Sequence, residues 1–197
     1  MNFLAHLYLS GNNHQVMVGN FMADRIRSSQ MDTLSADMAS GVRLHRFIDH
    51  YTDTHPVVGQ SKERLRADFG KYAPVIVDVF YDHFLAAQWE KYHPESLEEY
   101  VGHCYGVIHA HKDFLPERVR FMFGYMRRDN WLLSYRELNG IRTALRNMSM
   151  RAQHTDNMHH SLALLESHYT DFQTEFDTFF SDLKDASQQE LSRLQGA

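Results

Sequence analysis

The chain has 197 residues, among them 20 Lys and Arg, 25 Asp and Glu and 14 His, so its net charge is −5 with His neutral. This length suits one domain with a single core, and the acidic balance gives no reason to expect a nucleic-acid-binding protein. No stretch approaches 18 uncharged apolar residues and no basic segment precedes the apolar run FLAHLYL, so we expect neither a membrane span nor a signal peptide. The single cysteine, Cys104, cannot form an internal disulfide, which suits a reducing, cytoplasmic location.

Hydrophobic periodicity predicts helices along most of the chain. Four prolines, in THPVV, YAPVI, YHPES and FLPER, mark helix starts near residues 56, 74, 94 and 116, because proline fits the first helical position, where its missing N–H would have no partner. No segment shows the period-two alternation of strands joined by hairpin turns. The predicted helices, in chain order, are 14–27, 35–54, 57–71, 75–92, 96–112, 117–127, 137–150 and 156–184.

The fold class is therefore all-α, a single-domain helical bundle. No Pro-, Gly- or Ser-rich linker interrupts the chain before its polar end. We treat residues 1–186 as one helical domain and residues 187–197 as a polar C-terminal tail.

Charged residues recur at helical spacing in RLHRFIDHYTD, residues 43–53. Side chains four apart lie on the same face of a helix, so His45, Asp49 and Asp53 form one column, and Arg46 and His50 form the next. Such a face is either exposed to water or binds something charged.

Two acidic residues near this stretch have structural alternatives. Asp24 lies in GNFMADRIR beside Arg25 and Arg27, in an otherwise apolar helix, and it either faces a ligand or forms an ordinary ion pair with Arg27. Asp53, followed by Thr54, either belongs to the charged column or caps the helix that follows.

A third cluster lies in VDVFYDHF, where Asp82 adjoins His83 in the most apolar predicted helix. Burying a carboxylate is costly unless it is paired or binds a metal, so Asp82 needs a partner. Carboxylate and neutral imidazole together suit zinc, manganese or iron, and helical bundles hold metals with ligands from facing helices. His6, in FLAHLYL, is a further candidate ligand, or alternatively a core histidine bonded to a carbonyl group. Asp78 is either part of the same site or simply solvated.

Five stretches of the chain, spread over residues 1–152, resemble one family. In order they are MNFLAHLYLS, GNFMADRIR, GVRLHRFIDHYTD, APVIVDVFYDHFLAAQW and NWLLSYRELNGIRTALRNMSMR. Together they closely resemble the acyl carrier protein phosphodiesterase family, which is similar to the HD-domain phosphohydrolases. The resemblance implies an HD-domain-like helical fold and a divalent metal held by His and Asp.

The activity that this resemblance implies is hydrolysis of the phosphodiester that links 4′-phosphopantetheine to a serine of holo acyl carrier protein. Manganese is the implied metal, with Fe²⁺ or Mg²⁺ as other divalent candidates. Nowhere is His followed directly by Asp, so HD-domain ligands cannot be transferred by simple alignment. The implied metal ligands are His6, Asp24, His45, Asp82 and His83. The implied catalytic residues are Asp49, Arg46 and His50, and the implied phosphate-binding residues are Arg46 and Arg27.

A carrier protein substrate is strongly acidic, so a basic surface near the site should help it to dock. The stretch RVRFMFGYMRRD supplies Arg118, Arg120, Arg127 and Arg128 among aromatic residues. The stretch SKERLR adds Lys62, Arg64 and Arg66. Alternatively, these cationic side chains simply solvate helix faces.

Three other functions are compatible with the sequence. One is a helical phosphohydrolase that acts on a free nucleotide. Another is a helical two-iron protein that carries out oxygenation, in which the additional His and Asp residues would bind the second metal. The third is a non-enzymatic helical module that binds an acidic partner, with buried ion pairs in place of a metal.

Overall fold

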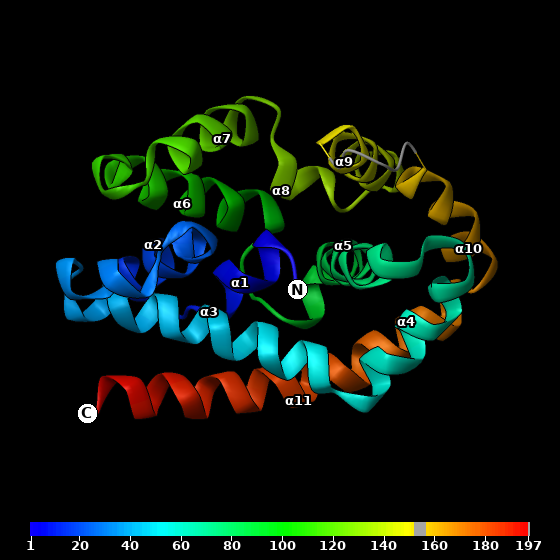
Figure 1. Cartoon of the computed structure of the whole chain (residues 1–197), viewed down its shortest axis with the longest axis horizontal. Coiled ribbons are helices and arrows are strands. Elements are labelled where there is room, and N and C mark those ends of the chain that lie inside the picture. The colour runs from blue at the N-terminus through cyan, green and yellow to red at the C-terminus, as the bar shows by residue number, and fades with distance from the viewer. Residues whose placement is uncertain (152–156, 197) are drawn as a thin grey trace.

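The computed structural model describes residues 1–151 and 157–196, and within these residues the chain forms helices and turns without any strand (Figure 1). Elements named η are 3₁₀-helices. In chain order the elements are α1 (Phe3–Leu9), α2 (His14–Met22), η1 (Ala23–Arg25), η2 (Ser28–Thr33), α3 (Ala36–Thr54), α4 (Pro56–Phe69), η3 (Gly70–Tyr72), α5 (Ala73–Ala87), η4 (Trp89–Lys91), α6 (Leu97–Ala110), η5 (Lys112–Phe114), α7 (Glu117–Arg128), α8 (Trp131–Ser134), α9 (Leu138–Arg151), η6 (Met158–Ser161), α10 (Leu162–Ser167) and α11 (Tyr169–Gln195). The all-α prediction is confirmed, whereas the likeness to HD domains stays a prediction.

The predicted helix boundaries agree closely with the structure for three helices. The predictions for α3, α7 and α9 match within one residue at each end. The predictions for α2, α4, α5 and α6 run too far, because each of these helices ends early and a 3₁₀ turn follows it. The short helices α1 and α8 were not predicted, since fewer than eight residues show little periodicity.

The C-terminal part of the chain corrects the predicted helix 156–184. Residue 156 lies outside the described residues, and a break at His168 separates α10 from α11. The last helix continues to Gln195, and Leu191 and Leu194 pack against the hydrophobic core. Most of the predicted tail therefore belongs to this helix, and the predicted domain boundary at residue 186 falls inside it.

In the arrangement of the helices, α1 lies at the centre (Figure 1). It contacts α2, α5 and α11, while α3 contacts α2, α4 and α11. The long helices α3 and α11 run side by side along one face, and α6, α7 and α9 lie on the other side of α1 and α5 (Figure 1). Among the helices of the described chain, none is long and apolar enough to cross a membrane.

Helices α2 and α3 pack closely, and their backbones touch at two glycines. A Cβ atom placed on Gly19 would collide with the carbonyl oxygen of Met38, and one on Gly41 would collide with the carbonyl oxygen of Val16. Only glycine permits this approach. The contact fixes the rotation and the height of α2 relative to α3, and therefore which side chains of the two helices meet.

This contact predicts opposite effects for the same substitution at two helical glycines. We expect Gly41→Ala to lower the free energy of unfolding by about 2 kcal/mol or more, because the new methyl group must push two backbones apart. The control is Gly102→Ala in α6, where nothing lies within 4 Å of the new Cβ; this variant should gain about 0.5–1 kcal/mol from helix propensity. Urea denaturation of both variants measures the difference, and equal stabilities would contradict the close contact.

Candidate active site

A buried pair of histidines lies where α1 crosses α3. The rings of His6, from α1, and His45, from α3, stack with their centroids 4.1 Å apart. Their residues are only 4% and 8% exposed. Imidazoles so far from water need fixed hydrogen-bond partners.

Asn20, from α2, supplies such a partner for both rings. Its Oδ1 lies 2.9 Å from Nδ1 of His6 and 3.0 Å from Nδ1 of His45. Its Nδ2 donates to the carbonyl oxygen of His6 and to Oγ of Ser10, which leaves Oδ1 as the acceptor. Both imidazoles therefore donate from Nδ1, and both direct Nε2 away from Asn20.

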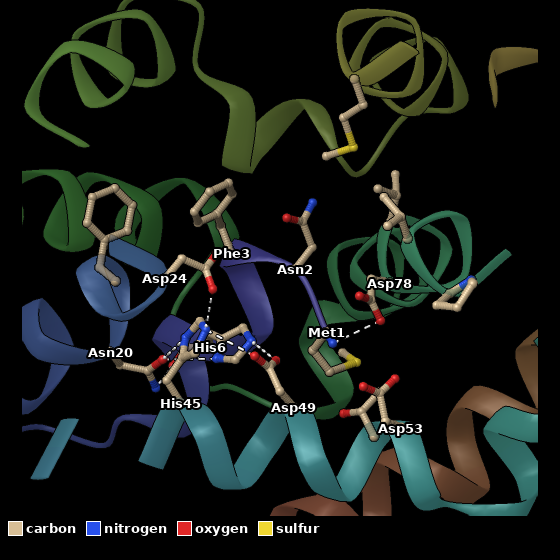
Figure 2. Close-up of a pocket in the computed structure, with 16 residues that line it drawn as sticks. Met1, Asn2, Phe3, His6, Asn20, Asp24, His45, Asp49, Asp53 and Asp78 are labelled. Carbon is tan, nitrogen blue, oxygen red and sulfur yellow. Dashed lines mark hydrogen bonds and ion pairs between the residues drawn. The ribbon is translucent and has the colours of Figure 1, made fainter. Parts of the chain in front are cut away.

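The two Nε2 atoms meet carboxylates instead. Asp49 lies with one oxygen 3.2 Å from Nε2 of His6 and the other 3.1 Å from Nε2 of His45. Asp24, from η1, lies 3.1 Å from Nε2 of His45. Figure 2 shows the two rings between Asn20 on one side and Asp49 on the other, with Asp24 above them. Three separate elements thus bring imidazole and carboxylate groups together.

The protonation of this cluster follows from burial and from these contacts. Burial, with the neighbouring charge of His45, lowers the pKa of His6 from 6.5 to about 4, so His6 is neutral at pH 7. Burial also acts to lower the pKa of His45, but hydrogen bonds with Asp24 and Asp49 outweigh it and raise the value to about 9. Burial alone would raise the pKa of Asp49, yet the hydrogen bond with His45 holds it well below its usual range.

Nε2 of His6 is a buried atom without a hydrogen-bond partner among the described residues. Because Nδ1 carries the proton, Nε2 presents a lone pair to the Asp49 oxygen 3.2 Å away. Two acceptors facing each other repel, and a cation between them removes the repulsion. His6, His45 and Asp49 each offer one ligand atom, and these atoms lie within 4.8 Å of one another. This donor set fits a divalent metal ion of the manganese, iron or zinc type.

The cluster lines one wall of a cavity of about 360 Å³. The opposite wall carries Asp78, whose Oδ1 accepts from the amine of Met1 at 2.9 Å (Figure 2). Asp53 also lines the cavity, and it accepts from Nζ of Lys62 at 2.9 Å instead of capping α4. The predicted column of His45, Asp49 and Asp53 therefore faces the cavity with all three members.

The neighbouring column, Arg46 and His50, does not face the cavity. This corrects the predicted catalytic roles of both residues and the predicted phosphate-binding role of Arg46. Arg46 and His50 are exposed and are absent from the cavity wall. The Arg46 guanidinium donates to the carbonyl oxygen of Ile26 at 3.1 Å. Arg27 is exposed and precedes η2, and it lines neither this cavity nor the larger groove beside it. Arg25 lines that groove instead.

The structure places Asp82 and His83 outside the cluster, which corrects their prediction as ligands of this site. Asp82 is fully buried, and its carboxylate accepts the backbone N–H groups of Leu4 at 2.8 Å and Ala5 at 3.2 Å. It thus caps α1 from α5, where the side chain of Asn2 makes no cap. His83 bonds the carbonyl oxygen of Tyr135 and the hydroxyl of Tyr169 with its two ring nitrogens.

The predicted docking residues fall into three groups. Arg118 and Arg128 line a groove of about 790 Å³ that adjoins the His/Asp cavity. Arg120, Arg127 and Arg128 line a shallower hollow, together with Lys112. Lys62 and Arg64 form internal ion pairs, with Asp53 and Glu175, so these two do not belong to an open basic surface.

Asn20 is the site residue that sequence reasoning missed. A lone amide in the apolar stretch MVGNFM carries the same signal as Asp82, a buried polar group that needs partners, but it has no charge to attract notice. Its function depends on two histidines from other helices, 14 and 25 residues away.

Fold and site together define a helical protein with a buried His/Asp site. A family model described as acyl carrier protein phosphodiesterase matches residues 1–183. A protein of that name from Photorhabdus laumondii is 35% identical over 181 residues, covering 91% of each chain. Another from Yersinia enterocolitica is 32% identical over 189 residues, covering 95% of this chain and 98% of the relative. A third from Escherichia coli O157:H7 is 32% identical over 181 residues, covering 91% of this chain and 94% of the relative.

This chain belongs to the acyl carrier protein phosphodiesterase family. No solved structure matches it significantly. The resemblance seen in the sequence is thus confirmed at the level of the family and of enzyme activity.

The cap that Asp82 provides predicts a graded loss of stability. Asp82→Ala leaves two buried N–H groups without an acceptor, and we expect it to cost about 1–3 kcal/mol. Asp82→Asn keeps one acceptor oxygen and should cost less. Urea denaturation measures both, with Asp68→Ala at an exposed position of α4 as the control. An Asp82→Ala variant as stable as the unmutated protein would refute the capping role.

The protonation of His45 predicts a pH dependence of stability in metal-free protein. Because its pKa rises from 6.5 to about 9 on folding, its contribution to stability is complete below pH 6.5 and is lost as the pH rises through 9. We therefore expect the melting temperature to fall between pH 7 and pH 9. His45→Gln should flatten this dependence, and an equal slope in both proteins would contradict the assignment.

Proposed function

We propose that this protein hydrolyses holo acyl carrier protein to apo carrier protein and 4′-phosphopantetheine, with a divalent metal, manganese, at His6, His45 and Asp49. Water adds to phosphorus, the bond from phosphorus to the seryl oxygen breaks, and the seryl oxygen takes up a proton. The observation that carries this proposal is the proton-free, unpartnered Nε2 of His6, which faces a carboxylate in a cavity beside a large groove.

The residues behind the proposed ligands support a metal role. Metal-binding imidazoles commonly donate their other ring N–H to a carbonyl, carboxylate or amide oxygen, which fixes the tautomer and aims the free nitrogen. Asn20 does this for both histidines at once. Asp24, in contact with His45, is the proposed fourth ligand, and its side chain is 74% exposed and so accessible to an incoming phosphate.

The metal, when bound, would supply Lewis acidity toward water and toward the diester. The protein itself would orient the reactants and offset the negative charge of the phosphate. Arg25 lies on the groove next to Asp24 and forms no ion pair among the described residues, so we assign it the phosphate-binding role that the sequence predicted for Arg27 and Arg46.

The groove rim also supports the proposed docking of an acidic carrier protein. Arg118 forms no ion pair among the described residues. Arg128 pairs with Asp129 at 2.7 Å and lies over the ring of Tyr125, with 4.8 Å from Cζ to the centroid. Both guanidinium groups are exposed beside the groove. Positive charge in this position speeds the encounter with an acidic partner more than it stabilises the complex. The cytoplasmic location predicted from the sequence fits this substrate.

The central test compares two histidines on one helix. We expect metal-stripped protein to be inactive on holo acyl carrier protein and active after addition of Mn²⁺, as measured by loss of the phosphopantetheine mass from the carrier. His45→Ala should lower kcat/KM by about 100-fold or more, because it removes a metal ligand. His50→Ala, five residues along α3 and facing outward, should stay within about twofold of the unmutated protein.

The possible outcomes separate the parts of the proposal. Activity that survives complete metal removal would refute the metal role but not the substrate. Hydrolysis of free nucleotides without cleavage of the carrier would refute the substrate but not the metal. Bound iron with oxygenase activity, or carrier binding without turnover, would instead favour the two-iron or the non-enzymatic function that the sequence also allows.

A further inference from the structure

The groove next to the His/Asp cavity has no assigned role. It has a volume of about 790 Å³, which is typical of sites for small organic ligands. Its walls come from the end of α2, from η1 and from helices α7, α8 and α9. Five residues line both the groove and the His/Asp cavity: Asn2, Phe3, Phe21, Asp24 and Met148. The two spaces therefore adjoin each other along these five residues.

The groove lining combines apolar walls with a few polar groups. Phe21, Met22, Met122 and Trp131 contribute apolar surface. Asn147 of α9 adds a half-buried side-chain amide that forms no hydrogen bond among the described residues. An amide with a free donor and a free acceptor suits a ligand that itself contains amide groups. The apolar part of this lining and the free amide of Asn147 fit a flexible chain of methylene and amide groups.

We propose that this groove binds the pantetheine arm of the carrier protein while its phosphodiester occupies the His/Asp cavity. The inference rests on the proposed function. It adds the place at which the leaving part of the substrate binds. The arm contains two amides, a hydroxyl and a dimethyl group, and when extended it has about the length of a four-residue peptide, roughly 14 Å. The arm would start at Phe3 and Phe21, which line both spaces together with Asp24. Figure 2 shows Phe3 beside Asp24.

Charge around the groove agrees with this occupant. Arg25 and Arg118 line it without ion-pair partners among the described residues, whereas Arg128 on the rim is paired with Asp129 at 2.7 Å. The pantetheine arm is neutral, so these cationic side chains have no negative charge on the arm to pair with. They lie where the acidic surface of a carrier protein would meet the enzyme once its arm is inserted. Binding energy from the arm would then position the diester, because contacts remote from the reacting atoms can be used to orient them.

The decisive variant fills the groove. Ala144 is half-buried on α9 and lines the groove, whereas Arg142, two residues earlier, is exposed and does not line it. We expect Ala144→Trp to raise KM for holo carrier protein tenfold or more, and to reduce carrier cleavage at least tenfold more than cleavage of bis(4-nitrophenyl) phosphate, which has no arm. Arg142→Trp, the matched control, should leave both activities unchanged. Free pantetheine should inhibit carrier cleavage competitively in the unmutated protein and lose this effect in Ala144→Trp.

A second variant tests the inference if Ala144→Trp does not fold. Asn147→Ala removes only the amide and should raise KM about three- to tenfold, with a smaller change in kcat. Ala144→Trp protein that is folded by circular dichroism yet cleaves holo carrier like the unmutated protein would overturn the inference. If the unmutated protein does not cleave the carrier at all, the proposed function fails, and calorimetric titration with pantetheine then decides: binding lost in Ala144→Trp supports the groove assignment, and no binding overturns it.

Discussion

The backbones of α2 and α3 touch at Gly19 and Gly41, and the candidate active site is built along the line of that contact. Gly41, His45, Asp49 and Asp53 are each four residues apart, so they form one row along α3. On the facing side, the carbonyl of Val16 lies against Gly41, and Asn20 one turn later lies against His45. Because the backbones are so close, short side chains such as Asn and Asp reach the imidazoles directly.

The same closeness explains why the site is polar and yet buried. Asn20 satisfies the Nδ1 groups of His6 and His45, and its own amide nitrogen bonds the carbonyl of His6 and the hydroxyl of Ser10. Every polar atom on this side of the cluster therefore has a partner. On the other side, the excess of acceptors is left facing the cavity. Behind the imidazoles, Asn20 is fully hydrogen-bonded, whereas the ligand atoms that face the cavity include more acceptors than hydrogen-bond donors. This arrangement favours the binding of a cation.

Sequence patterns correctly predicted the features that depend on a single helix. They failed where a side chain interacts with residues from other helices. The four-residue spacing correctly placed His45, Asp49 and Asp53 on one face, because helical periodicity is local. It could not say which of two adjacent columns faces inward, so Arg46 and His50 were assigned to a site from which they point away. Asp82 was correctly recognised as a buried carboxylate in need of a partner. That partner is the N-terminus of α1, a helix too short to be predicted from periodicity.

This dependence on α1 sets the character of the whole site. A helix of seven residues does not hold together alone in water, because nucleation costs more than so few hydrogen bonds return. α1 persists because Asp82 bonds its first N–H groups and because Leu4 and Leu7 are fully buried in the core. Yet α1 carries His6, one of the two imidazoles at the cavity. One ligand of the proposed metal site is thus in place only when the core is formed, so ion binding and folding of α1 must stabilise each other.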